Sequence, residues 1–390
     1  MAVRSIDLSE LGSLDAYVAP TIGSTGTISI QSSVVNESAF ALRVNPTGTG
    51  TGYADVGALL GNGQNGSLGG ADGYFSWDFR YATKPGSGSE PIAQVRVSTA
   101  TIKATLRLTS TGTLDLYSTA GALVASGATV LAADTWYRID LYVGKESSST
   151  ASDAPYILRI NGSVEYSGTG DLHENSPSWI RLGKVSNVSG QSVDFFYDNV
   201  SISDTEFAPA GSRVRAMKPD GAGHYSGATA GTWQDVDELP HDSDTTYLGF
   251  TSNTNRHSVT LESAVSAGIS GTIRAVQGYG FARDTGSTTV ESRWFLRSGG
   301  TDSDASGRNP GNTYAHFGRP PMETDPTDSG TWTLSKLNAL EVGCLLSASN
   351  ATEQRVTALG VLVEFVPTGG GVGGGGGVHL GLGKRIRLGV

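Results

Sequence analysis

The sequence predicts an all-β fold with two consecutive β-sandwich domains, and three observations carry this prediction. Apolar and polar residues alternate with a period of two in many segments, whereas sustained helical periodicity is almost absent. Glycine contributes 54 residues of 390, against a usual share of about 7%. Charged residues make up 16%, against roughly 25% in an average soluble chain. Short strands separated by glycine-rich and serine-rich turns favour a sandwich over a parallel α/β sheet.

The first strands of this pattern lie in the first half of the chain. Residues 102–108 alternate apolar positions with Lys103, Thr105 and Arg107, so one face of this strand is expected to be buried. A short turn leads to a second strand at 114–117, which predicts a hairpin.

Further along the same half, residues 136–143 alternate with Arg138 and Asp140 on the polar side. Asn161-Gly162 predicts a type I′ hairpin, because both positions of that turn require positive φ. A strand at 193–202 closes the series. The only expected helices are short ones, around Leu8 to Leu14 and from Ser335 to Leu340.

Composition divides the chain into four parts. An Ala-Pro-Ala-Gly-Ser segment near 207–212 separates two strand-rich regions, and glycine dominates after Pro367. We therefore expect an N-terminal arm (1–22), a first sandwich (23–208), a second β domain (209–367) and a glycine-rich linker with a basic-apolar terminal peptide (368–390).

Several classes of protein are disfavoured. The apolar stretches are far shorter than the roughly 20 residues of a membrane helix, and the acidic start of the chain is unlike a secretory signal. Cys344, the single cysteine, cannot form an internal disulfide or a zinc site by itself. A net charge of −10 with scattered basic residues disfavours nucleic-acid binding.

Residues 27–204 resemble the laminin-G-like, concanavalin A-like jelly rolls. The resemblance rests on "FALRV", "GYFSWDFRY", "DTWYRIDLYV", "YILRINGSVEYSG" and "WIRLGKVSNVSGQSVDFFYDNVSIS", in that order. It implies two sheets packed face to face. It does not select a function, because this fold serves lectins, adhesion modules and glycanases.

Residues 214–367 resemble a module of tailed-bacteriophage virion proteins. The segments that carry this resemblance are "GTWQDVDELPHDSDTTYL", "DPTDSGTWTLSKLNALEVGCLLS" and "RVTALGVLVEFVP". The resemblance implies a virion structural protein (a capsid decoration, a fibre or a tail appendage) on the exterior of the particle, made in the bacterial host cytoplasm. Its implied partners are other virion proteins and further copies of itself, as in a trimer.

No enzymatic activity is expected. Concanavalin A-like glycanases carry a strand with paired glutamates, because retaining hydrolysis needs two carboxylates about 5 Å apart. The late strand of the first domain contains only Asp194 and Asp198, and no such glutamate strand occurs within 27–204.

Two kinds of ligand remain candidates for the first domain. Trp77, Trp179 and Tyr197 are the candidates for stacking on host-surface glycans, with core packing as the alternative. Asp194 and Asp198 are candidate Ca²⁺ ligands at the rim of the sandwich, with solvated or turn-forming acids as the alternative. No other cofactor is expected.

The terminal peptide 378–390 is the candidate docking segment for the virion. Its basic and apolar residues would order on a partner surface at the end of the flexible linker. The residues concerned are His379, Leu380, Lys384, Arg385 and Arg387. A disordered tail, or anchoring through the N-terminal arm instead, are the alternatives.

The sequence therefore predicts a non-enzymatic virion protein that attaches to host-surface glycans. A secreted bacterial protein that binds or hydrolyses glycans is the alternative.

Overall fold

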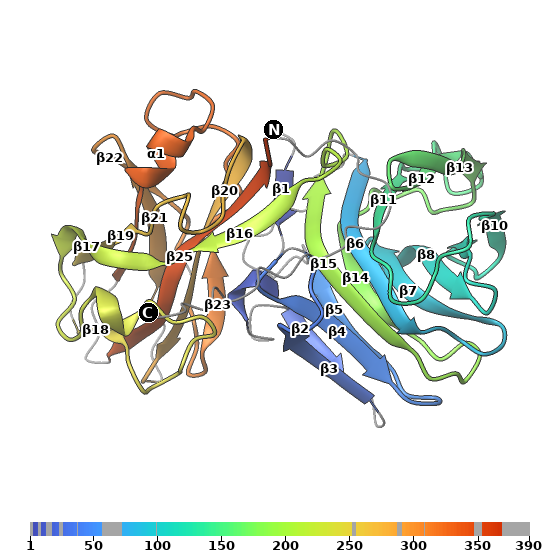
Figure 1. Cartoon of the computed structure of the whole chain (residues 1–390), viewed down its shortest axis with the longest axis horizontal. Helices are drawn as coiled ribbons and strands as arrows, with labels where there is room; N and C mark the ends of the chain where they lie inside the picture. The colour runs from blue at the N-terminus through green and yellow to red at the C-terminus, as the bar shows by residue number, and fades with distance from the viewer. Residues whose placement is uncertain are drawn as a thin grey trace, which may run out of the picture.

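The computed structural model confirms the all-β fold class, with 52% of the chain in strands and 3% in helices. It describes residues 3–6, 9–12, 18–22, 26–36, 38–56, 72–98, 100–251, 255–286, 291–307, 309–346 and 353–368. A first lobe (3–203) and a second lobe (213–368) are joined by a connecting segment (204–212). In Figure 1 the first lobe is on the right, in blue to green, and the second is on the left, in yellow to red.

Two antiparallel sheets form the first lobe, and we name the larger one sheet A. Its strands, in spatial order, are β13 (Ser163–Gly170), β12 (Ala154–Ile160), β11 (Tyr137–Val143), β6 (Gly73–Thr83), β15 (Asp194–Ser203), β4 (Ala41–Pro46) and β3 (Gly26–Gln31), and β1 (Val3–Ile6) also pairs with β15.

Sheet B is the second sheet of this lobe. Its strands, in spatial order, are β10 (Leu123–Ser126), β9 (Leu114–Ser118), β8 (Ile102–Thr109), β7 (Ser89–Arg96), β14 (Trp179–Lys184), β5 (Gly52–Val56) and β2 (Val18–Ile22). Both sheets therefore receive a strand from the segment that the sequence assigns to an N-terminal arm.

The predicted alternation builds the core of the first lobe. Ala104, Leu106 and Leu108 on β8 point into the sandwich, as do Ile139 and Leu141 on β11. The hairpin between β12 and β13 also confirms its prediction, because Asn161 (φ 51°) and Gly162 (φ 81°) form its two-residue turn.

The second lobe is also a sandwich of two antiparallel sheets. Sheet C contains β16 (Arg213–Met217), β25 (Gln354–Val366), β20 (Thr272–Asp284) and β23 (Ala315–Gly318) in this order, and β18 (Leu248–Phe250) pairs with β25. Sheet D contains β17 (Pro219–Ser226), β19 (Arg256–Leu261), β24 (Glu341–Leu346), β21 (Ser292–Ser298) and β22 (Thr301–Asp304).

Helices are short, as expected, but their bounds differ from the prediction. The N-terminal helical segment is a 3-10 turn, η1 (Ser9–Leu11), and another 3-10 turn, η3 (Trp233–Asp235), follows β17. Helix α1 (Leu334–Asn338) is capped by Thr333, whose side chain accepts a hydrogen bond from the Lys336 amide, instead of by Ser335. No helix in the described ranges has the length and apolarity needed to cross a bilayer.

Strand β25 belongs to the interiors of both lobes. Val361, Val363 and Phe365 face the core between sheets C and D. Ala358 and Leu362 belong to the apolar cluster that is continuous with the core of the first lobe. The two lobes therefore share apolar packing, although β25 itself runs within the second lobe, between β16 and β20 (Figure 1).

Candidate functional site

The outer face of sheet B carries a strip of polar and aromatic residues. The inward positions of its strands, such as Ala54, Val95 and Leu182, are in the core, so the alternate positions point outward. These outward residues, which we call the sheet B strip, are Tyr53, Asp55, Gln94, Arg96, Thr105, Arg107, Asp115, Tyr117, Trp179 and Arg181.

An arginine stacks on a tyrosine towards each side of the strip. The Arg107 guanidinium lies 3.8 Å from the centre of the Tyr117 ring, and that of Arg181 lies 3.9 Å from the centre of the Tyr53 ring. Stacking of this kind holds the guanidinium plane in place while its in-plane N–H groups can still donate. Both stacks are partly exposed.

Between the two stacks lies a set of amide, hydroxyl and guanidinium groups, and its members Gln94, Arg96 and Thr105 are only 5–6% exposed. Gln94 donates from its amide nitrogen to the Thr105 hydroxyl at 3.3 Å, and its amide oxygen accepts from Arg96. Arg96 also donates to the Ser98 carbonyl at 3.2 Å. The strip is therefore rich in hydrogen-bond donors and acceptors held on a rigid sheet.

The three arginines of the strip differ electrostatically. Burial would lower the pKa of Arg181, but its bidentate pairing with Asp55 (2.6 and 2.8 Å) raises the pKa overall. The pKa of Arg96 is lowered, first by burial and then by the charge of Arg181. Burial also lowers the pKa of Arg107, despite the opposing effects of Tyr117 and Glu90.

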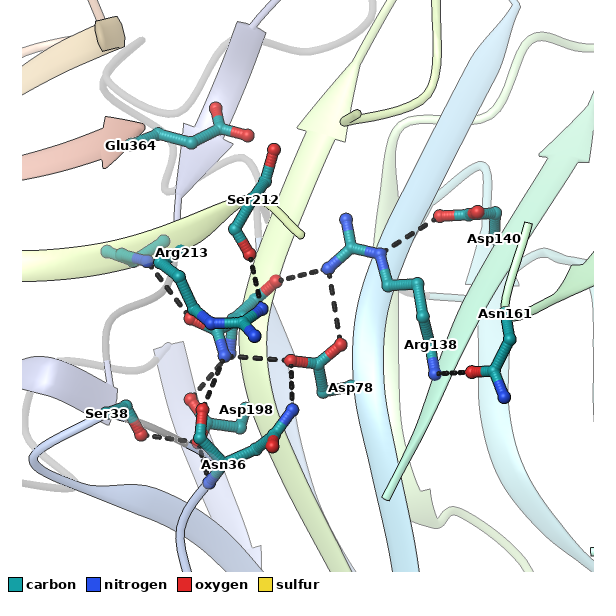
Figure 2. A network of polar contacts seen from close by, with 12 residues as sticks. Asn36, Ser38, Asp78, Arg138, Asp140, Asn161, Asp198, Ser212, Arg213 and Glu364 are labelled. Carbon is teal, nitrogen blue, oxygen red and sulfur yellow. Dashed lines mark hydrogen bonds and ion pairs between the residues drawn. The ribbon is translucent and has the colours of Figure 1, made fainter. Parts of the chain in front are cut away.

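The outer face of sheet A carries a different polar cluster, which is buried (Figure 2). Asp78 accepts hydrogen bonds from the side-chain amides of Asn36 and Asn199, both at 2.8 Å. Arg138 contacts Asp140 at 3.2 Å, Asp78 at 3.6 Å and the Asn199 carbonyl at 3.2 Å. These side chains bind one another and leave little of their surface to solvent.

The second lobe and the connecting segment cover this cluster. The Val214 amide of β16 donates to the Asn199 side chain at 3.0 Å. Phe207 of the connecting segment packs edge-on against Tyr74, at 5.2 Å between ring centres, and Arg159 lies over its ring. Glu364 enters from β25 (Figure 2), fully buried and 2.9 Å from Arg274.

The three aromatic residues predicted to stack on glycans do not present a ring to solvent. Trp77 and Tyr197 are 0% exposed in the core, and the Tyr197 hydroxyl donates to the Ile92 carbonyl at 2.7 Å. Trp179 does lie on the outer face of sheet B, beside Arg96 in the strand register, but it is only 3% exposed. The prediction of exposed rings at these positions is therefore corrected.

The two candidate Ca²⁺ ligands are already bound by protein groups. Arg43 holds Asp194 through two hydrogen bonds of 2.9 and 2.8 Å. Asp198 accepts from the amides of Asn36 and Asn199, both at 2.7 Å, and from the Ser38 hydroxyl. A carboxylate surrounded by N–H and O–H donors does not suit a cation, so this prediction is also corrected.

Across the described part of the chain, no group of three or more His, Cys, Asp and Glu residues is placed to hold a metal ion. Cys344 is buried in the core of the second lobe. The candidate docking residues His379, Leu380, Lys384, Arg385 and Arg387 lie outside the described residues.

A cavity of about 440 Å³ lies where the two lobes meet. Glu10 and Phe40 line it from the first lobe, and Arg215, Lys218 and Leu239 line it from the second. Glu10 accepts a hydrogen bond from the Ala39 amide at 3.0 Å. The cavity is separate from the sheet B strip, and any molecule bound in it would contact both lobes.

The sequence contains a signal for the sheet B strip that the search for single aromatic residues missed. Alternation identifies Thr105 and Arg107 as the polar side of a strand, but it does not connect Tyr53, Tyr117 and Arg181 to them. These residues come from strands distant in sequence, and only the order of strands in sheet B brings them onto one face.

No protein-family model matches this chain, and no curated protein sequence matches it either. Among solved structures it is similar to "Cellulose induced protein, Cip1", with a TM-score of 0.39, 14% identity and coverage of 50% of this chain and 92% of that chain. It is also similar to domain 4 of AbnA, a GH43 extracellular arabinanase from Geobacillus stearothermophilus in complex with arabinotriose. There the TM-score is 0.33 and the identity 17%, over 52% of this chain and 91% of that chain.

A third similar structure is the Trypanosoma rangeli sialidase in complex with a difluorinated sugar acid, with a TM-score of 0.32 and 10% identity. That match covers 45% of this chain but only 27% of the sialidase chain. Similarities of this size assign neither a function nor a site, and they include both enzymes and non-catalytic modules. Nothing in these comparisons shows a bacteriophage origin.

Proposed function

We propose that the protein binds a glycan chain along the sheet B strip. The observation that carries this proposal is the pair of arginine–tyrosine stacks, at 3.8 and 3.9 Å, on either side of the Gln94–Thr105 pair. Glycan sites combine aromatic surface with a small number of fixed amide, hydroxyl and charged groups. The strip provides all of these on neighbouring strands.

The dimensions of the strip favour an extended ligand. Tyr117 lies on β9 and Tyr53 on β5, with β8, β7 and β14 between them. Neighbouring strands are about 4.8 Å apart, so the two stacks are on the order of 19 Å from each other across the sheet. A ligand that contacts both stacks must therefore be an oligosaccharide or a polysaccharide instead of a single sugar.

Substitution of one stacked tyrosine tests this proposal. Tyr117→Ala should weaken binding of the full chain to glycans by about tenfold, because truncation of a central aromatic contact commonly costs more than 1 kcal/mol. Tyr247→Ala is the matched control, since Arg355 lies 4.2 Å from that ring in the second lobe. The readouts are a glycan array and calorimetric titration with the glycans retained on it. Equal affinities for the two variants, or no binding by the wild-type chain, would overturn the proposal.

We propose binding without turnover. Support comes from β15, where Asp194 and Asp198 are engaged by protein donors and where the paired glutamates of concanavalin A-like glycanases do not occur. Incubation of the wild-type chain with each bound polysaccharide should produce no new reducing ends and no unsaturated sugar products. Time-dependent appearance of either product would identify an enzyme instead.

We also propose that the protein is located on the exterior of a tailed-bacteriophage particle. The support is the resemblance of residues 214–367 to virion modules, and the alternative remains a secreted bacterial glycan-binding protein. Mass spectrometry of purified particles should detect the chain at structural stoichiometry, and light scattering should detect an oligomer such as a trimer. Detection in the culture medium of uninfected bacteria would favour the alternative.

The proposed anchor to the particle is the terminal peptide within 378–390. A chain that ends at Pro367 should then fold and bind glycan but be lost from particles. Normal incorporation of the shortened chain would reject the tail as the anchor and would leave the N-terminal segment as the candidate.

A further inference from the structure

We infer that the glycan bound by the sheet B strip is anionic, and that Arg107 receives one of its carboxylates. This inference rests on the proposed function and specifies the chemical class of the ligand. It follows from the environment of Arg107, a half-buried arginine of the strip that forms no ion pair with the described residues.

Many arginines elsewhere in the molecule are neutralised by carboxylates, whereas Arg159 lies over the Phe207 ring and Arg319 donates to Ser303. Arg43 pairs with Asp194 at 2.8 Å, Arg274 with Glu364 at 2.9 Å, and Arg297 with Asp302 at 2.8 Å. Within the strip itself, Arg181 is held by Asp55. In this fold, a guanidinium that leaves water is usually matched by an acid of the same chain.

Arg107 is not matched in this way. It forms no ion pair with any residue that the structure describes. Its Nε is buried and has no hydrogen-bond partner among the described residues. The Tyr117 ring stabilises the guanidinium from one face, and the Tyr117 hydroxyl supports it as a hydrogen-bond partner, but neither group carries a negative charge. Asp115 lies opposite Arg107 in the strand register and Glu90 acts on it through its charge, but neither forms an ion pair with it.

The immediate surroundings add positive charge. The described residues of the strip include three arginines against two acids, Asp55 and Asp115, and Asp55 is bound to Arg181. Arg96 contacts neutral oxygens of Gln94 and Ser98. The pKa values of Arg96 and Arg107 are both lowered, which agrees with an excess of positive charge in the strip. Burial lowers each pKa, and nearby negative charge raises it by less.

A carboxylate fits this environment better than a sugar hydroxyl does. The guanidinium fork matches a carboxylate with two parallel N–H···O bonds, and such charge-assisted bonds are roughly twice as strong as neutral ones. A sulfate ester presents the same chemistry to an arginine. The shared requirement is therefore an anionic group on the glycan, and uronate carboxylates are the form to which we commit.

The decisive experiment compares a ligand with its own neutral derivative. The full chain is titrated with a linear polyuronate and with the same polymer after reduction of its carboxylates to hydroxymethyl groups. Wild-type protein should bind the polyuronate about tenfold or more tightly than the reduced polymer, and added salt should weaken only the binding of the charged form. A sulfated galactan and its desulfated form make the second arm, which identifies the type of anion.

The variant Arg107→Gln assigns the effect to this residue. It should weaken binding of the polyuronate more than binding of the reduced polymer, so that the ratio of the two affinities falls from about tenfold towards one. Arg293→Gln in β21 is the control, because it removes a guanidinium from the second lobe, far from the strip in sequence. That side chain is 43% exposed and lies 3.8 Å from Glu291. The control variant should bind both polymers as the wild type does.

The outcomes separate the inference from the proposed function. Equal binding of the charged and reduced polymers by the wild-type chain would overturn the inference while the glycan-binding proposal stands. Preference for the sulfated galactan alone would keep an anionic ligand but reject the carboxylate. Absence of binding to every polymer would overturn both.

Discussion

The two outer faces of the first lobe have similar sequence patterns and different roles. Both come from strands in which polar residues alternate with core residues, and both carry arginines, aspartates and tyrosines. On sheet A, Arg138, Asp78 and Asp198 are enclosed by protein partners (Figure 2). On sheet B, Arg107 has an aromatic partner and no ion-pair partner among the described residues. Alternation therefore identifies a polar face but not its use.

Coverage by the rest of the chain makes the difference. Strands β16 and β25 and the connecting segment lie against sheet A, where Val214 and Phe207 contact its outer residues. Carboxylates on that face meet donors from the same chain, so the polar groups serve to join the lobes. On sheet B, Arg107 and the ring of Tyr117 stay half-buried without a covering lobe, so a ligand from outside can still reach them.

The largest expected effect is on the covered face. Asp198→Ala removes the acceptor of the Asn36 and Asn199 amides and of the Ser38 hydroxyl. One buried and two part-buried donors without their charged partner should lower the free energy of unfolding by about 3–5 kcal/mol in urea denaturation. The matched control is Asp115→Ala in the sheet B strip. This substitution should change the free energy of unfolding by no more than about 0.5 kcal/mol. Similar losses in both variants would contradict the contrast between the faces.

The next effect concerns the shared apolar packing. Leu362→Ala leaves a cavity on the side of β25 that belongs to the first-lobe cluster, and a buried leucine truncation costs about 2–5 kcal/mol. Val164→Ala, at a side chain that is 58% exposed, should cost much less. Calorimetry should show the melting of both lobes shifting together. A shift confined to one transition would show that the lobes unfold independently.

A smaller, pH-dependent effect should arise from Glu364. Burial raises its pKa above the usual value, although Arg274 and Arg138 oppose the shift. Between the unfolded pKa near 4.5 and the raised folded pKa, the native state therefore holds the proton more tightly than the unfolded state. Its contribution to stability falls as the pH rises through that window.

Glu364→Gln should remove this slope from a plot of unfolding free energy against pH, and it should be at least as stable as the wild type at neutral pH. Arg274 would keep its contact with Glu206, at 3.0 Å. A variant that is strongly destabilised at neutral pH would show instead that the ionised pair stabilises the junction between the lobes.

The smallest effect is expected for Arg107→Gln in the absence of a ligand. Because the fold disfavours the charge of Arg107, its removal should change the free energy of unfolding by less than about 1 kcal/mol, even with the loss of the ring contact. Thermal melting of the variant beside the wild type measures this. A loss as large as that of Asp198→Ala would make Arg107 a structural residue and would remove the contrast between the two faces.

Local patterns predicted much of the fold. The strand at 102–108, the Asn161-Gly162 hairpin and the inward positions of 136–143 all depend on neighbours in sequence, and the structure contains them. The site was predicted poorly, because exposure depends on which strands become neighbours and which lobe covers them. Trp77 and Tyr197 occupy inward positions, and Asp198 is enclosed by a loop more than 150 residues earlier in the chain.

Strand β25 also determines when the molecule is completed during synthesis. The strands of sheets A and B end at Ser203, whereas β25 ends at Val366. At about 5–20 residues per second, a ribosome needs on the order of 10–30 s to add the residues between these two points. During that interval β25 is not yet present to cover the outer face of sheet A. That face carries polar groups such as Asp78 and Arg138, but the apolar surface that later joins the cluster of Ala358 and Leu362 stays exposed until β25 is made.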